Sequence, residues 1–273
     1  KKKVALHNLG CKVNSYELEA MQQLLEQAGY EIVPFEPGAD VYVINTCTVT
    51  NIADRKSRQM LHKAKKMNPD AVVVATGCYV QTDEGKLETD EAVDLVLGNN
   101  QKKNIVEVLA EFEKEHQRQA SILLRLTRQR NMKNWKSAVQ AEHVRAYIKV
   151  QDGCNQFCTY CIIPYARGRV RSREKENILN EVHKLAKAGY KEVVLTGIHL
   201  SSYGVDFPED KKETLLSLIQ AVNEVEGIQR IRLGSLEPGI VTEEFAKRTV
   251  FYVKVCLIFI FPCRADAIRL WRE

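Results

Sequence analysis

The sequence predicts an α/β protein: an amino-terminal doubly wound parallel sheet, followed by a partial β/α barrel that is incomplete at its carboxyl end. Short apolar strand patterns alternate with helical patterns from about residue 3 to 112, and again from about 146 to 233. Such alternation is typical of parallel sheets with helices packed on their faces. A stretch without this strand–helix alternation separates the two halves. A chain of 273 residues is long enough for two domains, each with its own core.

The first half of the chain supplies the elements of the doubly wound sheet. Apolar residues recur at helical spacing in the first helix, at Leu18, Met21, Leu24 and Leu25. A long basic helix ends shortly before Pro69, because proline cannot continue a helix. We expect strands at 3–9, 40–44, 71–75 and 93–96, and helices at 15–28, 52–66 and 103–112.

Three cysteines follow the carboxyl ends of three different predicted strands. They are Cys11, Cys47 and Cys78. In open α/β sheets ligands bind at this edge, which brings together residues that are distant in sequence. Three thiolates there suit a four-iron cluster with one iron free of protein ligands. The alternative is that each cysteine is a small core residue, as free cysteines often are.

The second half begins with an apolar alternating run that feeds a further cysteine loop. We expect strands at 146–150, 192–195 and 228–233, and helices at 174–188 and 214–225. Between them, arginines occupy every second position at Arg167, Arg169, Arg171 and Arg173. In an extended segment the four would share one face. They would then meet an RNA backbone or pair with nearby carboxylates.

The loop after the run carries the spacing Cys154-x3-Cys158-x2-Cys161. A loop this short turns three thiolates toward one point, and a four-iron cluster held by them keeps one open corner. A disulfide would leave one of the three cysteines unpaired. Zinc would require a fourth Cys or His, normally in a second pair downstream. Inert thiols are the remaining alternative.

With Tyr160 just before the third cysteine, this loop resembles the signature of the radical S-adenosylmethionine enzymes. The resemblance implies that Cys154, Cys158 and Cys161 are the catalytic cluster ligands, and that S-adenosylmethionine on the open iron yields a 5′-deoxyadenosyl radical. It places Tyr160, and by position Gly197, Ser235 and Glu237, at the cofactor. A turn-forming glycine and polar strand caps are the structural alternatives.

The segments 9–14, 45–50 and 77–81 resemble the three cysteine motifs of the methylthiotransferase amino-terminal domain. That resemblance implies an auxiliary four-iron cluster on Cys11, Cys47 and Cys78, and hence two [4Fe-4S] clusters in the chain. The runs Cys-Lys-Val-Asn, Cys-Thr-Val-Thr and Cys-Ile-Ile-Pro-Tyr-Ala-Arg-Gly are similar to the branch that acts on N6-threonylcarbamoyladenosine in tRNA.

This resemblance implies that the chain attaches a methylthio group to carbon 2 of that adenine, which lies beside the anticodon. The implied partners are the tRNA anticodon loop, S-adenosylmethionine and an electron donor such as flavodoxin or ferredoxin. Three rival interpretations stay open: the same chemistry on a ribosomal protein, a zinc-stabilised RNA-binding module without catalysis, and an inactive truncated product.

The resemblance covers about residues 1–112 and 143–248. We therefore expect a methylthiotransferase domain at 1–113, a linker at 114–142, a partial radical S-adenosylmethionine core at 143–248 and a tail outside the family at 249–273. A truncated or frameshifted gene product would explain the tail, where Cys256 and Cys263 have no assigned role. The basic run 122–136 is either a solvated face or a contact to phosphates.

Composition places the expected chemistry in the cytoplasm. The net charge of +5 fits an RNA partner without requiring one. The first ten residues lack the apolar core of a signal peptide, and the apolar run 255–261 is too short for a membrane span. Eight cysteines without a secretion signal favour metal binding or catalysis in a reducing compartment.

Overall fold

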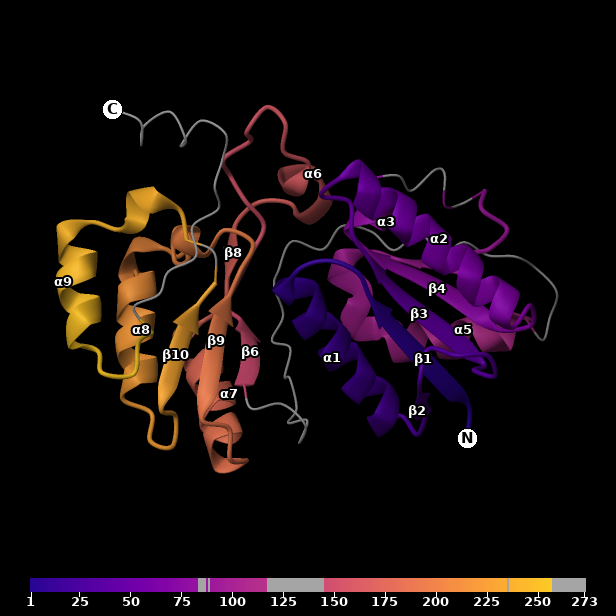
Figure 1. The fold of residues 1–273 in the computed structure, drawn as a ribbon, viewed down its shortest axis with the longest axis horizontal. Coiled ribbons are helices and arrows are strands. Elements are labelled where there is room, and N and C mark those ends of the chain that lie inside the picture. Colours follow the sequence, from indigo (N-terminus) through magenta and orange to yellow (C-terminus); the bar gives the residue numbers. More distant parts are fainter. Residues whose placement is uncertain (83–86, 88, 117–144, 235, 257–273) are drawn as a thin grey trace. The chain divides into compact units, whose positions relative to one another are not determined.

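The computed structural model describes residues 1–82, 87, 89–116, 145–234 and 236–256 (Figure 1). The chain divides into two compact units: Lys1–Ala138 with Asn155–Gly168, and Val139–Cys154 with Arg169–Glu273. The predicted domain boundaries at 1–113, 114–142, 143–248 and 249–273 stay a prediction, because most of the linker and the tail lie outside the described residues. The basic run 122–136 and Cys263 lie outside them as well.

A five-stranded parallel sheet forms the centre of the first unit, in the order β2-β1-β3-β4-β5. Its strands are β1 (Lys3–Asn8), β2 (Glu31–Val33), β3 (Val41–Thr46), β4 (Val72–Gly77) and β5 (Leu95–Leu97). Strand β3 is buried along its whole length, as a central strand covered on both faces must be.

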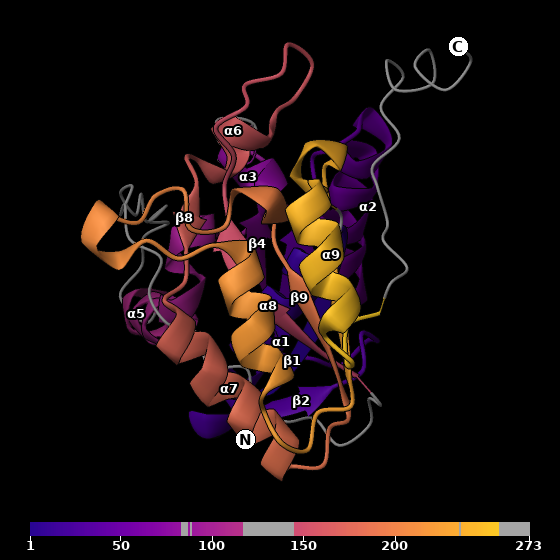
Figure 2. The same cartoon turned by 90° about the vertical axis from the view of Figure 1, so that its left-hand side faces the viewer.

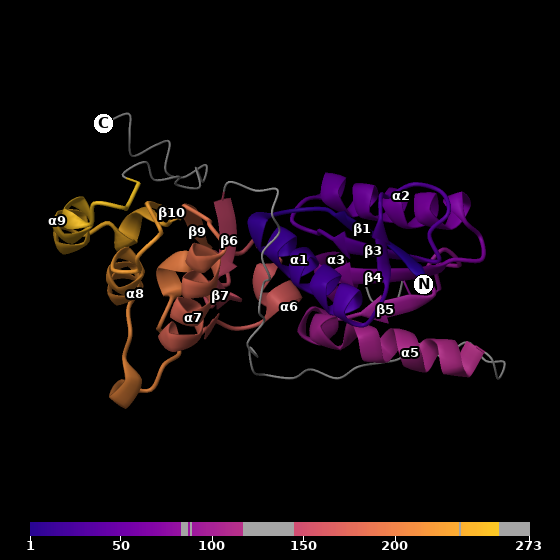
Figure 3. The ribbon, with the colours of Figure 1, turned by 90° about the horizontal axis from the view of Figure 1, so that it is seen from below.

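Helices cover both faces of this sheet (Figure 3). The helices of the unit are α1 (Lys12–Gln27), α2 (Asn51–Met67), α3 (Cys78–Thr82), α5 (Ile105–His116) and α6 (Ile163–Arg167), with the 3-10 helix η1 at Asn99–Asn104. On one face, Met21 of α1 and Leu109 of α5 pack with Val43. On the other, Leu61 of α2 packs with Ile44. The predicted doubly wound sheet is confirmed.

The second unit holds a three-stranded parallel sheet in the order β10-β9-β6, and a short antiparallel pair, β7 with β8. The strands are β6 (Arg145–Lys149), β7 (Gln151–Asp152), β8 (Arg171–Ser172), β9 (Glu192–Thr196) and β10 (Arg230–Leu233). The helices are α7 (Lys175–Lys187), α8 (Leu215–Asn223) and α9 (Glu243–Phe251).

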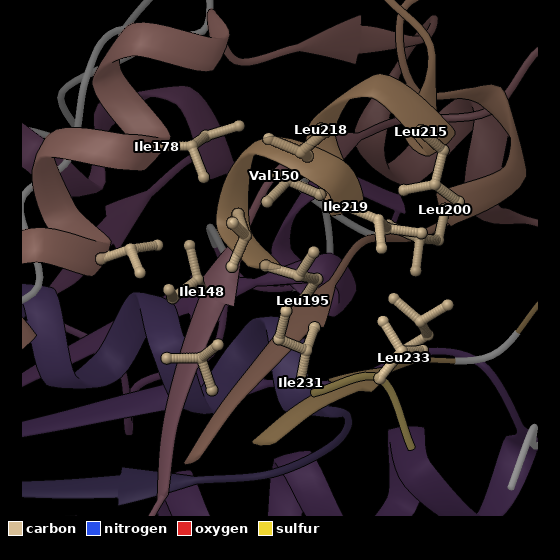
Figure 4. Packing of buried hydrophobic residues seen from close by; sticks show 14 of the residues in the cluster. Ile148, Val150, Ile178, Leu195, Leu200, Leu215, Leu218, Ile219, Ile231 and Leu233 are labelled. Atoms are coloured by element: carbon tan, nitrogen blue, oxygen red, sulfur yellow. The ribbon is translucent and has the colours of Figure 1, made fainter. Parts of the chain in front are cut away.

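One apolar core joins these strands to their helices. Helices α7 and α8 lie in front of the strands in Figure 2. Ile148, Leu195 and Ile231, from the three neighbouring strands, are fully buried and pack toward Ile178 of α7 and Ile219 of α8 (Figure 4). Repeated strand–helix units of this kind agree with the predicted partial β/α barrel.

Several boundaries differ from the sequence prediction. Helix α1 begins at Lys12 instead of about Ser15, so that Cys11 is its N-cap. The short helices α3 and α6, and also α9, were not predicted. A five-residue helix has too few turns to show an apolar period. None of the described helices combines the length and apolar character that a membrane span requires.

Glu192, at the start of β9, ties the three strands of the second sheet together at their amino ends. Its buried carboxylate accepts hydrogen bonds from Arg230 (2.9 Å) and Arg232 (2.7 Å) and lies 3.0 Å from Nε of Arg145. Burial alone would raise the pKa of Glu192, but the two hydrogen bonds and the charge of Arg145 hold it below its usual value. The ionised carboxylate therefore stabilises the folded chain.

We predict that Glu192→Gln lowers the free energy of unfolding near pH 7 by about 1–3 kcal/mol. Because the folded-state pKa lies below the unfolded-state pKa, the stabilisation is present above the unfolded-state value and is lost as the pH falls through the folded-state value. The loss of stability toward acid should therefore be shallower in the variant. Urea unfolding between pH 3 and pH 7 measures this, with the exposed Glu209→Gln as control. Parallel curves for the parent and the Glu192 variant would contradict the prediction.

Candidate functional site

Three adjacent strands of the first unit end in the three predicted cysteines. Strands β1, β3 and β4 are neighbours in the sheet. Thr46 pairs with Gly77 across β3 and β4, so Cys47 and Cys78 leave the sheet at the same level, on strands about 4.8 Å apart. Cys11 follows the end of β1, where Asn8 pairs with Asn45. The sheet therefore brings the three cysteines to one edge.

The three thiols are close enough to influence one another. Cys47 and Cys78 are buried and Cys11 is exposed. Burial raises the pKa of Cys47, and the charges of Cys78 and Cys11 raise it further, while the backbone N–H groups of Val49 and Thr48 lower it. None of the described cysteines, from Cys11 to Cys256, forms a disulfide with another described cysteine.

Two glycines allow close packing at this edge of the sheet. Gly10 has a φ of +117°, and a Cβ there would lie 3.2 Å from Sγ of Cys47. Gly77 has a φ of +106°, and a Cβ there would lie 2.3 Å from the backbone oxygen of Thr46. Both positions require the conformational freedom of glycine, and both immediately precede a cysteine.

Amide side chains fix the start of α1 against the end of β3. Nδ2 of Asn14 donates to the backbone oxygens of Leu9 (2.8 Å) and Thr46 (3.1 Å). Nδ2 of Asn45 donates to the backbone oxygen of Asn14 (2.8 Å). These bonds hold the first turn of α1, and therefore its N-cap Cys11, beside the strand that ends in Cys47.

A buried ionic network lies next to the same edge. Nζ of Lys102, which is fully buried, contacts the carboxylate of Glu17 and donates to Oδ1 of Asn45 (2.9 Å). Arg167 of α6 donates from NH1 (2.9 Å) and NH2 (3.3 Å) to that carboxylate. Its Nε lies 3.2 Å from Sγ of Cys78, within hydrogen-bonding distance of a sulfur acceptor.

This network fits an anionic group bound by the thiols. Lys102 and Arg167 both contact the carboxylate of Glu17, and Arg167 also approaches the sulfur of Cys78; buried charges normally require partners. Burial lowers the pKa of Lys102, Arg167 adds to the effect, and Glu17 and Cys78 oppose it. Thiolate ligands would add negative charge beside these two cations. Sequence reasoning missed Glu17 and Lys102; the one signal was a carboxylate among the inward-facing residues of α1.

The residues of the Cys154 loop are divided between the two units. In the second unit, Cys154 is buried and follows β7, where Asp152 accepts from the backbone N–H of Gly153 (2.8 Å) and pairs with Lys149 (2.7 Å). In the first unit, Cys158 and Cys161 are half-buried and joined by a backbone hydrogen bond of 2.9 Å.

Aromatic residues precede both cysteines of this loop in the first unit, Phe157 before Cys158 and Tyr160 before Cys161. Phe157 has a φ of +46°, rare for a residue with a side chain, and packs edge-on against Tyr165. Tyr160, the predicted cofactor contact, is 72% exposed. Its ring is therefore open to a ligand or a partner.

No group of three or more His, Cys, Asp or Glu side chains among the described residues is placed to hold a metal ion. A four-iron cluster makes a different demand, because each thiolate binds a different iron and the sulfurs stand further apart than the ligands of one ion. Cys11, Cys47 and Cys78 lie at one edge of the sheet in the first unit, close enough for the charges of Cys11 and Cys78 to act on Cys47.

In the second unit, predicted residues gather where β9 and β10 end. A Cβ at Gly197 would lie 2.8 Å from Oε1 of Gln151, which accepts from the backbone N–H of His199 (2.8 Å). Nε2 of His199 lies 3.0 Å from a carboxylate oxygen of Glu237. Ser235 lies outside the described residues. Gln151 and His199 were not among the predicted site residues.

The segment that carries the four arginines is not extended throughout, so the condition for a shared face is not met. Residues 163–167 form α6, which ends at Gly168 with a φ of +79°. Arg167, Arg171 and Arg173 pair with the carboxylates of Glu17, Asp152 and Glu181, which confirms the ion-pair alternative for these three. Arg169 is exposed.

Two family models match the chain. Residues 3–98 match the uncharacterized protein family UPF0004, and residues 148–250 match the radical SAM superfamily. Among solved structures, the chain is similar to the radical S-adenosylmethionine methyltransferase TsrM from Kitasatospora setae, with a TM-score of 0.61 over 93% of this chain and 58% of that one. At 17% identity this likeness shows the fold alone.

Relatives in sequence carry more specific names. A threonylcarbamoyladenosine tRNA methylthiotransferase MtaB from Aquifex aeolicus is 42% identical over 98% of this chain and 64% of its own length. The protein of the same name from Bacillus subtilis is 44% identical over 88% of this chain and 53% of its own. A tRNA-2-methylthio-N(6)-dimethylallyladenosine synthase from Clostridium botulinum is 33% identical over 97% and 59%. The chain thus spans between about half and two thirds of these relatives.

The space beside the strand end gives a testable consequence. We predict that Gly77→Ala lowers the free energy of unfolding by about 2–4 kcal/mol, because the side chain adds a clash with Thr46 to an unfavourable φ. Gly38 is the matched control, since its φ is +108° and a Cβ there would meet nothing within 4 Å. Gly38→Ala should cost about 1 kcal/mol. Urea unfolding of the iron-free chain compares them, and equal losses would count against the crowding at Gly77.

Proposed function

The chain belongs to the methylthiotransferases of the radical S-adenosylmethionine superfamily, and from this premise we propose that it is a tRNA methylthiotransferase. Its substrate is N6-threonylcarbamoyladenosine beside the anticodon, and its product is the 2-methylthio derivative. The proposal follows the names of the Aquifex and Bacillus relatives, which are more similar to the chain than the Clostridium synthase is.

One observation carries the proposal. Cys11, Cys47 and Cys78 follow the ends of three neighbouring strands in the domain that precedes a Cys-x3-Cys-x2-Cys loop. Superfamily membership implies one [4Fe-4S] cluster and S-adenosylmethionine. A second cluster on the strand-end cysteines is part of the proposal, supported by the buried positive charge of Arg167 beside Cys78.

The two sets of three cysteines have distinct tasks in the proposed reaction. Cys154, Cys158 and Cys161 hold one cluster, and Cys11, Cys47 and Cys78 hold the other. When bound, the two clusters and S-adenosylmethionine supply the radical chemistry that replaces the C–H bond at carbon 2 of the adenine by a C–S bond. The C–H bond offers acid–base catalysis little to act on, because its hydrogen is not acidic.

The protein contributes binding, orientation and shielding. Asp152 holds the start of the cysteine loop through Lys149 and the backbone of Gly153. At the ends of β9 and β10, Gly197 lets Gln151 approach its backbone closely, and Glu237 offers a carboxylate that lies 3.0 Å from His199. Polar groups at this edge suit the amino and hydroxyl groups of S-adenosylmethionine.

The proposed electron donor is a flavodoxin or ferredoxin, and the proposed compartment is the cytoplasm.

The two-cluster arrangement predicts a metal count. After anaerobic reconstitution, the chain should bind about eight irons with matching sulfide, and replacing either cysteine trio by alanine should leave about four. Cys256→Ala is the matched control and should retain the full amount, since Cys256 is a free thiol outside both trios. Iron and sulfide assays measure this. Tightly held zinc without sulfide would favour the non-catalytic RNA-binding module instead.

The substrate assignment predicts a change in tRNA. In a strain that lacks its own enzyme, the chain should restore 2-methylthio-N6-threonylcarbamoyladenosine, measured by mass spectrometry of tRNA nucleosides. Cys158→Ala should abolish the product. A methylthio group on a ribosomal protein, with tRNA unchanged, would favour the rival substrate. If a chain with both clusters loaded forms neither product, the chain is a fragment that does not turn over.

A further inference from the structure

Arg167 joins two cluster-binding segments that are far apart in the sequence. It ends α6, six residues after Cys161, and its side chain is fully buried in the first unit. Helix α6 lies against α3, which begins at Cys78. Nδ2 of Asn99 also donates to the backbone oxygen of Ala166 (3.0 Å), which fixes the same helix.

Every nitrogen of the Arg167 guanidinium has a partner. NH1 and NH2 donate to the two carboxylate oxygens of Glu17, at 2.9 and 3.3 Å. NH2 also donates to Oδ1 of Asn14. Nε is left to point at Sγ of Cys78, at 3.2 Å. Because the guanidinium is planar and rigid, the carboxylate sets the direction of the Nε–H bond.

The supporting carboxylate is itself held in place. Glu17 is buried on α1 and contacts the fully buried Lys102 of η1. Lys102 in turn donates to Asn45, at the end of β3. The orientation of Arg167 therefore depends on a chain of buried groups that reaches the strand before Cys47.

We infer that Arg167 is a positioning residue for the cluster on Cys11, Cys47 and Cys78: it donates an N–H···S hydrogen bond to the Cys78 ligand and sets the cluster's stability and reduction potential. The inference rests on the proposed function, because it requires a cluster at this edge. Hydrogen bonds to ligand sulfurs make reduction easier, since they offset the added negative charge. Outer partners of this kind also retain the metal.

The test isolates this cluster by replacing Cys154, Cys158 and Cys161 with alanine in the full chain. In that background, Arg167→Lys keeps the charge but loses the fixed fork, and Arg167→Gln loses the charge as well. Both should shift the reduction potential to lower values and speed iron loss to a chelator about tenfold or more. Arg169→Lys, an exposed arginine two residues away, should change neither.

A reciprocal background provides the internal reference. With Cys11, Cys47 and Cys78 replaced, the remaining cluster should keep its potential in the Arg167→Lys variant. Equal shifts of both clusters would indicate a general structural effect and overturn the inference. So would an unchanged potential and unchanged iron retention for the Cys11, Cys47 and Cys78 cluster.

A measurement that leaves Arg167 unchanged tests the inference even where the Arg167 variants do not fold. The Cys154, Cys158 and Cys161→Ala chain, with 15N in its arginine guanidinium groups, should show 15N hyperfine coupling in pulsed EPR of the reduced cluster. Absence of coupling would overturn the inference. If this chain binds no cluster at all, the two-cluster proposal fails together with the inference. If it binds one without coupling, only the inference fails.

Discussion

The register of the parallel sheet in the first unit is the constraint on which the candidate site depends. Thr46 pairs with Gly77 and Asn8 with Asn45, so three strands end at corresponding levels. Because the strands are parallel, the carboxyl ends of all three lie at the same edge of the sheet. A shift of one residue in β3 or β4 would turn every side chain of that strand to the opposite face, and the cysteine after it would leave the group.

Packing on both faces holds that register. Val43 and Ile44 are successive residues of β3, yet each belongs to a different apolar core, one beneath α1 and α5 and the other beneath α2. A slipped strand would therefore misplace residues in both cores at once. The site is assembled by the burial of residues that take no part in its chemistry, which is why cysteines more than 30 positions apart meet reliably.

The parts of this arrangement that produce local, periodic signals could be predicted from the sequence. Apolar runs, helical spacing and the cysteines after strand ends gave the sheet and the candidate ligands, because these signals are local and periodic. The short helix α6 and the pairing of Arg167 with Glu17 have no such signal, since the partners are 150 residues apart. The same four arginines fitted an RNA-facing row equally well. Only the three-dimensional contacts show three of them paired with carboxylates.

The buried charges beside the cysteines agree with the proposed cluster on these thiols. A buried ion pair contributes little to stability compared with apolar residues of the same size, because both charges lose their hydration. Here two cations, Lys102 and Arg167, share one carboxylate, Glu17. Folding alone gives little reason to place this network beside thiols. The proposed cluster gives one, because Nε of Arg167 lies within hydrogen-bonding distance of Sγ of Cys78 while NH1 and NH2 are held by Glu17 and Asn14.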